Sequence, residues 1–197
     1  MRVVCLVALM CSLSAQAGTP DQVRSALLFQ IAKFIDFTHV QSDSVRYCFT
    51  SLSKGPGPFL AQQQNLLIRG QPIAITELSK SSQNDELSRQ CDITYFDGKI
   101  ENDILLPWIK TRPLTTFTVG SNFEFLEQGG VAALIQEGKK IRLYINREQL
   151  EQVSFKVQAR LMTVSKFYPN WFYLLTIGSN PIISSIRFCL VIPNFCK

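Results

Sequence analysis

The sequence predicts an α/β fold: a single three-layer domain that is Rossmann-like but lacks a nucleotide site. We expect a mostly parallel sheet of about six strands that ends in an antiparallel hairpin. Two observations predict this class. Short strand-like segments alternate with helical ones along the chain, which favours βαβ crossovers and parallel strands. The region from Val131 to Ile145 instead has the apolar run, glycine-containing turn and alternating run of a hairpin.

The hairpin is the most regular pattern in the chain. Its first run follows Gly129 and Gly130, and its second run alternates apolar residues with Arg142, Tyr144 and Asn146. This period of two is typical of a strand with one buried face. Asn146 ends the second strand, and we expect it to cap a following helix.

The first 17 residues have the features of a secretory signal peptide. Arg2 precedes an apolar stretch, and Ala15-Gln16-Ala17 supplies the small residues of a cleavage site. The apolar stretch is too short to span a bilayer. We therefore expect cleavage after Ala17, export, and a folded domain over residues 18–166 followed by an apolar tail over residues 167–197.

The remaining elements are predicted in chain order. Thr19-Pro20-Asp21 begins a helix that we expect to run to about Asp36. Its buried stripe is expected to consist of Val23, Ala26, Leu27, Ile31, Phe34 and Ile35. Strands are expected over residues 45–50, 72–78, 91–96 and 114–119, helices over 59–67 and 101–110, and a polar loop over 80–90.

Charge and motif patterns exclude several function classes. The formal net charge is +5, but the basic residues are scattered and form no stripe for nucleic acid. The Gly-Pro-Gly-Pro run at residues 55–58 is no phosphate loop, because its prolines cannot donate backbone hydrogen bonds. His39 is the single histidine, which argues against a histidine-rich metal centre or a hydrolase triad. We therefore predict no catalytic residues, no metal site and no cofactor, and we interpret Trp108 as half-packed under a helix or as an exposed anchor.

Four cysteines lie beyond the signal peptide: Cys48, Cys91, Cys189 and Cys196. In an exported protein an even number of cysteines usually indicates disulfides, but the spacing alone leaves three pairings open. The tail could form another hairpin closed by Cys189 and Cys196. It could serve as a partner-binding appendage, or it could have no evolved role.

Four segments in this order resemble the YfiR family of periplasmic proteins. They are the first helix VRSALLFQIAKFIDF, the strand CDITYF with its leading cysteine, the segment TFTVGSNFEFLEQGGVAALIQEGKKIRLYIN, and the closing helix QARLMTVSK. The resemblance covers about residues 22–166, and the order and spacing of the segments carry it. Family members usually have Trp-Pro after the first helix, where this chain has Phe37-Thr38.

The resemblance implies structural roles for particular residues. Cys48 and Cys91 would form a disulfide, with a redox sensor as the alternative interpretation. Gly129, Gly130, Arg142 and Asn146 would define the fold rather than catalyse a reaction. The segment from Leu150 to Val164 would break near Val153–Val157, whereas the alternative is one continuous helix.

The resemblance also implies a regulatory function. The chain would be a non-enzymatic periplasmic regulator that binds the periplasmic domain of an inner-membrane diguanylate cyclase and represses cyclic di-GMP synthesis. An outer-membrane lipoprotein would relieve the repression, and the resemblance is compatible with a homodimer, although the sequence does not determine the oligomeric state. The alternative is a periplasmic small-molecule-binding sensor, because an open α/β sheet offers a crevice at its strand ends.

Overall fold

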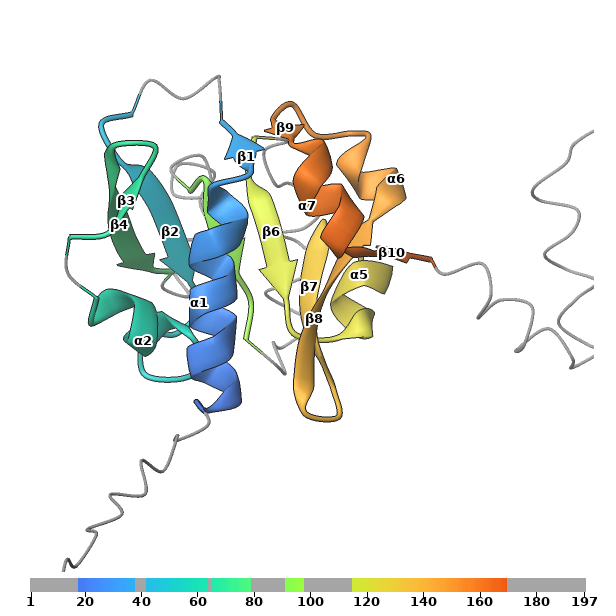
Figure 1. Cartoon of the computed structure of the whole chain (residues 1–197), viewed down its shortest axis with the longest axis horizontal. Coiled ribbons are helices and arrows are strands. Elements are labelled where there is room, and N and C mark those ends of the chain that lie inside the picture. The colour runs from blue at the N-terminus through green and yellow to red at the C-terminus, as the bar shows by residue number, and fades with distance from the viewer. Residues whose placement is uncertain (1–17, 38–41, 64, 79–90, 98–114, 170–197) are drawn as a thin grey trace, which may run out of the picture.

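The computed structural model describes residues 18–37, 42–63, 65–78, 91–97 and 115–169 (Figure 1). Within these residues the main sheet has eight strands, in the order β10-β8-β7-β6-β5-β2-β4-β3. They are β2 (Val45–Phe49), β3 (Leu67–Ile68), β4 (Gln71–Glu77), β5 (Ile93–Tyr95), β6 (Phe117–Gly120), β7 (Ala132–Glu137), β8 (Lys140–Asn146) and β10 (Lys166–Tyr168). Neighbouring strands are parallel except in the pairs β7–β8 and β3–β4. The predicted mostly parallel α/β fold with a terminal antiparallel hairpin is confirmed, with more strands than the six expected.

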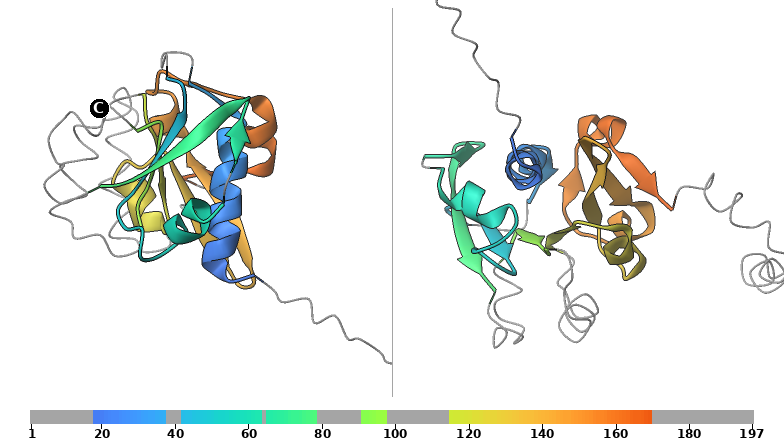
Figure 2. Two further views of the ribbon diagram at one scale, coloured as in Figure 1. Left: turned by 90° about the vertical axis from the view of Figure 1, so that its left-hand side faces the viewer. Right: turned by 90° about the horizontal axis from the view of Figure 1, so that it is seen from below.

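Helices cover both faces of the sheet, as Figures 1 and 2 show. The helices are α1 (Pro20–Ala32), α2 (Gly57–Ala61), α5 (Phe123–Glu127), α6 (Arg147–Leu150) and α7 (Ala159–Val164). Alternate residues of β7 distinguish the two faces: Leu134 joins the core cluster that includes residues of α1, α2 and α7, whereas Ile135 joins the cluster around Phe125 of α5. The three-layer arrangement therefore follows from the alternation of side chains along the strands.

Helix α1 begins as predicted. The Thr19 hydroxyl accepts a hydrogen bond from the Gln22 N–H at 3.3 Å, and the Gln22 side chain accepts one from the Thr19 N–H at 2.7 Å. The expected end at Asp36 is wrong. Residues Ile35–Asp36 form β1, which pairs antiparallel with β9 (Lys156–Val157) in a separate two-stranded sheet. This tertiary pairing outweighs the helical pattern of the sequence.

The buried face of α1 also differs from the expected stripe. The buried residues are Ser25, Leu28, Ile31 and Ala32, whereas Val23 is 40% exposed. Because Ser25 is polar, the sequence pattern does not indicate that it belongs to the buried face of α1. A small hydroxyl is accommodated beneath the helix, and the stripe is rotated by about one residue.

The predicted helix over residues 59–67 is also wrong beyond Ala61. Helix α2 is shorter and starts earlier, and Leu67 belongs to β3. Asn65 has a φ of 59°, a left-handed conformation that does not continue a right-handed helix. Arg69 and Gly70 follow with φ of 52° and 83°, and they form the two-residue turn that joins β3 to β4.

The strands expected near residues 45–50, 72–78 and 91–96 are confirmed as β2, β4 and β5. The strand expected over residues 114–119 is β6, which ends one residue later than expected, at Gly120. Sequence patterning missed α5, which Asn122 caps by accepting a hydrogen bond from the Phe125 N–H at 2.9 Å. It also missed β10, which pairs parallel to β8 and places Phe167 and Tyr168 in the main sheet. The break near Val153–Val157 is confirmed by β9, so the continuous-helix alternative is wrong.

Several sequence interpretations concern residues outside the described ranges. These are the loop over 80–90, the helix over 101–110 with Trp108, His39, and the tail from residue 170 with Cys189 and Cys196. In the part of the chain that the structure describes, every helix is too short or too polar to cross a membrane.

Candidate functional site

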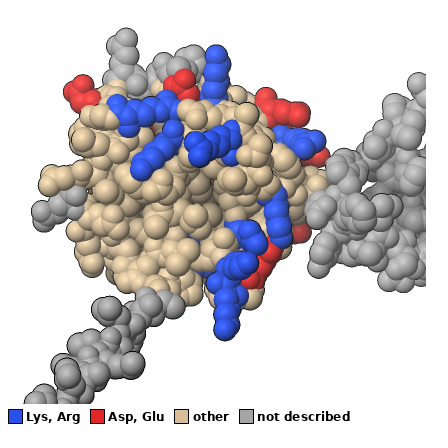
Figure 3. All heavy atoms as spheres, viewed as in Figure 1, with Lys and Arg blue, Asp and Glu red and all other residues tan. Residues whose placement is uncertain are grey.

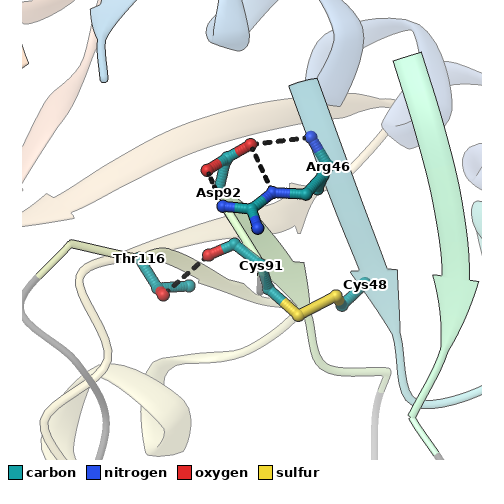
Figure 4. Close-up of a disulfide and its surroundings, with 5 residues drawn as sticks. All are labelled: Arg46, Cys48, Cys91, Asp92 and Thr116. Atoms are coloured by element: carbon teal, nitrogen blue, oxygen red, sulfur yellow. Dashed lines mark hydrogen bonds and ion pairs between the residues drawn. A yellow bond between two sulfur atoms is a disulfide. The ribbon is translucent and has the colours of Figure 1, made fainter. Parts of the chain in front are cut away.

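Cys48 and Cys91 form a disulfide between two neighbouring parallel strands (Figure 4). Cys48 lies in β2 and Cys91 lies two residues before the start of β5, with 5.8 Å between their Cα atoms. The side chains are nearly fully buried, with exposed fractions of 3% and 2%. A bond in this setting is shielded from solvent thiols, which fits a structural role better than a redox sensor.

A buried ion pair lies beside the disulfide (Figure 4). The Arg46 guanidinium donates to both carboxylate oxygens of Asp92, from Nη2 to Oδ1 at 2.9 Å and from Nε to Oδ2 at 3.3 Å. The Arg46 backbone N–H also donates to Oδ2 at 2.8 Å. The Asp92 side chain is only 4% exposed, so these bonds compensate for the desolvation of its charge.

Backbone contacts extend this junction to the next strand. The Asp92 carbonyl accepts a hydrogen bond from the Phe117 N–H at 2.8 Å, and the Thr116 hydroxyl donates to the Cys91 carbonyl at 2.8 Å. The starts of β2, β5 and β6 are therefore fixed to one another. The sequence does contain an indication of this ion pair. Arg46 and Asp92 are charged residues within or beside apolar strands, and opposite charges in neighbouring strands can pair.

A small cleft opens at this end of the sheet, with a volume of about 190 Å³. It is lined by residues of β1, the start of β2, the β3–β4 turn and Asp92. At its rim Arg69 and Asp36 form an ion pair at 3.3 Å, with both side chains about two-fifths exposed. The cleft lies at the amino-terminal ends of the parallel strands, whereas open α/β sheets usually bind ligands at the carboxyl-terminal ends.

The carboxyl-terminal ends of β2 and β5 carry a different polar cluster around Asp97. Burial raises the pKa of this carboxyl group, as does the nearby charge of Asp21, while Arg24 and Lys54 oppose the rise. Burial also raises the pKa of the Tyr95 hydroxyl strongly. After β2 the chain forms β4 on one side of β2 and later β5 on its other side, so the order in which strands are added to the sheet reverses at β2. The Asp97 cluster lies at this point of reversal.

The glycine pair predicted to define the fold does so by terminating α5. Gly129 has a φ of 100°, and its N–H donates to the Leu126 carbonyl while the Gly130 N–H donates to the Phe125 carbonyl. This pattern is a Schellman motif. A Cβ atom on Gly130 would lie 2.0 Å from the Phe125 ring, so a side chain at this position is incompatible with the packing of the ring.

Asn146 connects three elements. Its side-chain amide donates to the Leu126 carbonyl at the end of α5 at 3.0 Å, and its side-chain oxygen accepts from the Gln149 N–H at 3.3 Å. Its backbone N–H donates to the Val131 carbonyl ahead of β7. The predicted helix cap is thus confirmed. The expected exposed face of β8 holds only at its start, because Tyr144 and Asn146 are buried under α5.

The β7–β8 hairpin presents a polar cluster to solvent. Lys166 of β10 donates to both carboxylate oxygens of Glu137 at 2.8 Å and to the Tyr144 hydroxyl, which itself bonds Glu137. Hydrogen bonds from Lys166 and then Tyr144 lower the pKa of Glu137, and the bond to Glu137 raises the pKa of Lys166. Arg142 is exposed on the same strand as Tyr144, as the sequence predicted.

Charged side chains are unevenly distributed on the face shown in Figure 3. Lys and Arg gather over the β7–β8 hairpin, where Lys139, Lys140 and Arg142 lie, and across the upper part of this face. Acidic side chains lie among both groups. Among the described residues, no cluster of three or more His, Cys, Asp or Glu side chains could hold a metal ion.

The comparison with protein families decides the affiliation of the chain. The model of the DUF4154 family, described as YfiR/HmsC-like, matches residues 21–166. The chain belongs to this family. The match ends at the first residue of β10, so the YfiR/HmsC-like segment contains the disulfide, the Asp92 ion pair, the glycine pair and Asn146.

Two solved structures align with part of this chain. A conserved domain protein from Vibrio cholerae is 14% identical, with a TM-score of 0.49, and the ABC domain in complex with L-Trp from Streptococcus pneumonia is 9% identical, with a TM-score of 0.45. Each alignment covers 75% of this chain but only 60% of the other chain. No curated protein matches the sequence.

Proposed function

We propose that this YfiR/HmsC-like protein is a periplasmic regulator that acts by binding another protein. Its partner would be the periplasmic domain of an inner-membrane diguanylate cyclase, and its effect would be to repress cyclic di-GMP synthesis. The family match over residues 21–166 is the observation that carries the proposal. The N-terminal signal-like segment and the buried Cys48–Cys91 disulfide support export, because disulfides persist in oxidising compartments.

The mechanism that fits such a regulator is a population shift. A protein that binds the inactive form of the cyclase more tightly than the active form lowers the active fraction by that difference in affinity. To change the active fraction from 99% to 1%, the affinity ratio must be roughly 10⁴. An outer-membrane lipoprotein that sequesters the regulator would restore activity by mass action.

The rigid construction of the domain supports a binding role. The disulfide and the Asp92 ion pair join β2 to the start of β5, and the Asn146 bonds join β8 to α5, so these described elements are held in one arrangement. A preorganised surface loses little conformational entropy when it binds.

The decisive experiment is co-purification with the periplasmic domain of a membrane diguanylate cyclase encoded in the same genome. We expect a stable complex, and we expect cyclic di-GMP to rise when the gene is deleted. Absence of binding together with unchanged cyclic di-GMP would refute the proposal. A variant lacking the disulfide, Cys48→Ser with Cys91→Ser, should bind less well in proportion to its loss of folded protein.

A small-molecule sensor is the second candidate, and the 190 Å³ cleft favours it. The exposed Arg69–Asp36 ion pair at the rim of the cleft would recognise a polar ligand. A thermal-shift screen of polar metabolites would detect such a ligand, because binding to the native state raises the melting temperature. Loss of the shift in Arg69→Ala, but not in Lys139→Ala on the distant hairpin, would place the ligand in the cleft.

A further inference from the structure

Strand β10 forms one end of the main sheet. It pairs with β8 on one side, and on its other side no strand of the described part of the chain lies against it. The strand ends at Tyr168, one residue before the described part of the chain ends at Pro169. Residues 170–197 are therefore attached to the domain at this edge of the sheet (Figure 1).

Two exposed apolar side chains lie next to this edge. Phe123 is the first residue of α5 and is 41% exposed, and Val164 is the last residue of α7 and is 72% exposed. Of the large apolar side chains in the described ranges, only Val23 and Leu67 are also this exposed. Helices α5 and α7 cover opposite faces of the sheet (Figure 2), so apolar surface lies on both sides of the edge. Exposed apolar surface of this kind often marks a place where another segment binds.

On the α5 side, three aromatic rings form what we call the aromatic platform: Phe123, Tyr144 and Tyr168. The Phe123 ring packs edge-on against the Tyr144 ring, with 4.8 Å between their centroids, and lies 6.2 Å from the Tyr168 ring. Beside the platform the charge of Lys166 is neutralised by Glu137 at 2.8 Å. The platform therefore suits an uncharged aromatic occupant.

The first apolar run beyond the described residues has this chemistry. Residues 171–177 have the sequence WFYLLTI, which contains three successive aromatic residues and no charge. Trp171 follows Tyr168 by three positions, and three residues span up to about 10 Å when extended. This reach exceeds the 6.2 Å between the Tyr168 and Phe123 rings. The run can therefore contact Phe123 without any rearrangement of the domain.

We propose that residues 171–177 of this chain cover the aromatic platform, with Trp171 packed beside Phe123. The direct attachment favours this occupant over a separate protein, because a short tether gives an effective concentration in the millimolar range. A run with so many large apolar residues would also promote aggregation if it remained in solvent. The family match ends at Lys166, so the covering segment lies outside the YfiR/HmsC-like part of the chain. The inference does not depend on the proposed cyclase partner, and failure of either leaves the other intact.

Acrylamide quenching of tryptophan fluorescence tests the cover in the chain without its signal segment. The sequence has two tryptophans, so Trp108→Phe leaves Trp171 as the single fluorophore. We expect the quenching constant of Trp171 to be several-fold lower in the folded chain than in the same chain unfolded in urea. Equal quenching in the two states would leave the platform to a separate partner and overturn the proposal.

Substitution of the platform identifies where Trp171 lies. In the Trp108→Phe background, Phe123→Ala should raise the quenching constant of Trp171 toward its value in urea. The matched control is Val23→Ala, because Val23 is 40% exposed on α1 and should leave the quenching unchanged. An unchanged constant in Phe123→Ala would contradict the proposal. So would protection of Trp171 that appears only at high protein concentration, since that result would assign the run to a second copy.

Thermal unfolding gives a second measurement that begins with a variant outside the folded core. Trp171→Ser should lower the melting temperature by several degrees if the run is packed on the domain. Combined with Phe123→Ala, it should lower the melting temperature by less than the sum of the single variants, because the two side chains share one contact. If Phe123→Ala does not fold, Phe123→Leu replaces it and keeps an apolar side chain against Tyr144. An unchanged melting temperature in Trp171→Ser, or additive losses in the double variant, would refute the proposed contact.

Discussion

Arg46 holds the buried carboxylate of Asp92 through two side-chain hydrogen bonds, directly beside the Cys48–Cys91 disulfide. Arg46 lies two residues before Cys48, and Asp92 follows Cys91, so the covalent and the ionic link join the same two strands. The disulfide limits how far the strands can separate, while the ion pair fixes their register.

Removal of the Arg46 side chain should be costly because it leaves the Asp92 carboxylate buried without its counter-charge. We expect Arg46→Ala to lower the free energy of unfolding by about 3 kcal/mol, as measured by urea denaturation. Arg69→Ala is the control, since its pair with Asp36 is exposed and should contribute less than about 1 kcal/mol. Equal losses in the two variants would show that burial of Asp92 does not govern the energy.

Loss of the disulfide should destabilise the domain through the unfolded state. The bonded cysteines are 43 residues apart, and chain-entropy arguments give about 4 kcal/mol for a loop of this size. The double variant Cys48→Ala, Cys91→Ala should show this loss in urea denaturation. Reductant should lower the stability of the unmodified chain by a similar amount and should affect the double variant much less.

Gly130 should tolerate no side chain. We expect Gly130→Ala to cost about 1–3 kcal/mol, because its Cβ would overlap the Phe125 ring. Gly138→Asn is the matched control: no atom lies within 4 Å of its Cβ position, and asparagine accepts a positive φ. Combination of Gly130→Ala with Phe125→Leu should cost less than the sum of the single variants. An additive result would exclude a clash with the ring.

The two hydrogen bonds of the Asn146 side chain can be separated by substitution. Asn146→Asp keeps the acceptor for the Gln149 N–H but replaces the donor to the Leu126 carbonyl with a carboxylate oxygen. We expect a loss of about 2 kcal/mol at pH 7 in thermal unfolding. The loss should shrink at acidic pH, where the carboxyl group is protonated and can donate. Unchanged stability of Asn146→Asp at pH 7 would show that the helix cap alone matters.

The Glu137 carboxyl group should titrate below its ordinary pKa of 4.5, since Lys166 and Tyr144 stabilise its charged form. A lowered pKa in the folded state contributes stability above the unfolded-state pKa, and this contribution is lost as pH falls through the folded-state pKa. NMR titration of the carboxyl carbon should show the pKa rising toward 4.5 in Lys166→Met and staying low in Lys139→Met. An unchanged pKa in Lys166→Met would contradict this assignment.

Local patterns predicted those parts of the fold that local chemistry determines. The cap at Thr19, the alternation in β8 and the cap at Asn146 each depend on residues within a few positions of one another. The last turn of the expected first helix failed for the opposite reason. Ile35 and Asp36 pair with residues 156–157, and a contact so distant in sequence leaves no local trace.

The candidate site shows the same division. Resemblance to a family supplied the Cys48–Cys91 pairing, because spacing alone could not choose among three possibilities. The Arg46–Asp92 pair was missed, since the neighbouring position of β2 and β5 was unknown before the sheet order was available. Gly130 was recognised as structural, but its reason, the Phe125 ring, required the packing of α5.

The bond between Cys48 and Cys91 encloses α2, β3 and β4 within one covalent ring. A protease that cuts the exposed turn at Arg69 would therefore not release a fragment. The nicked molecule would migrate as a single species until a reducing agent is added, and its two pieces could refold together as one unit.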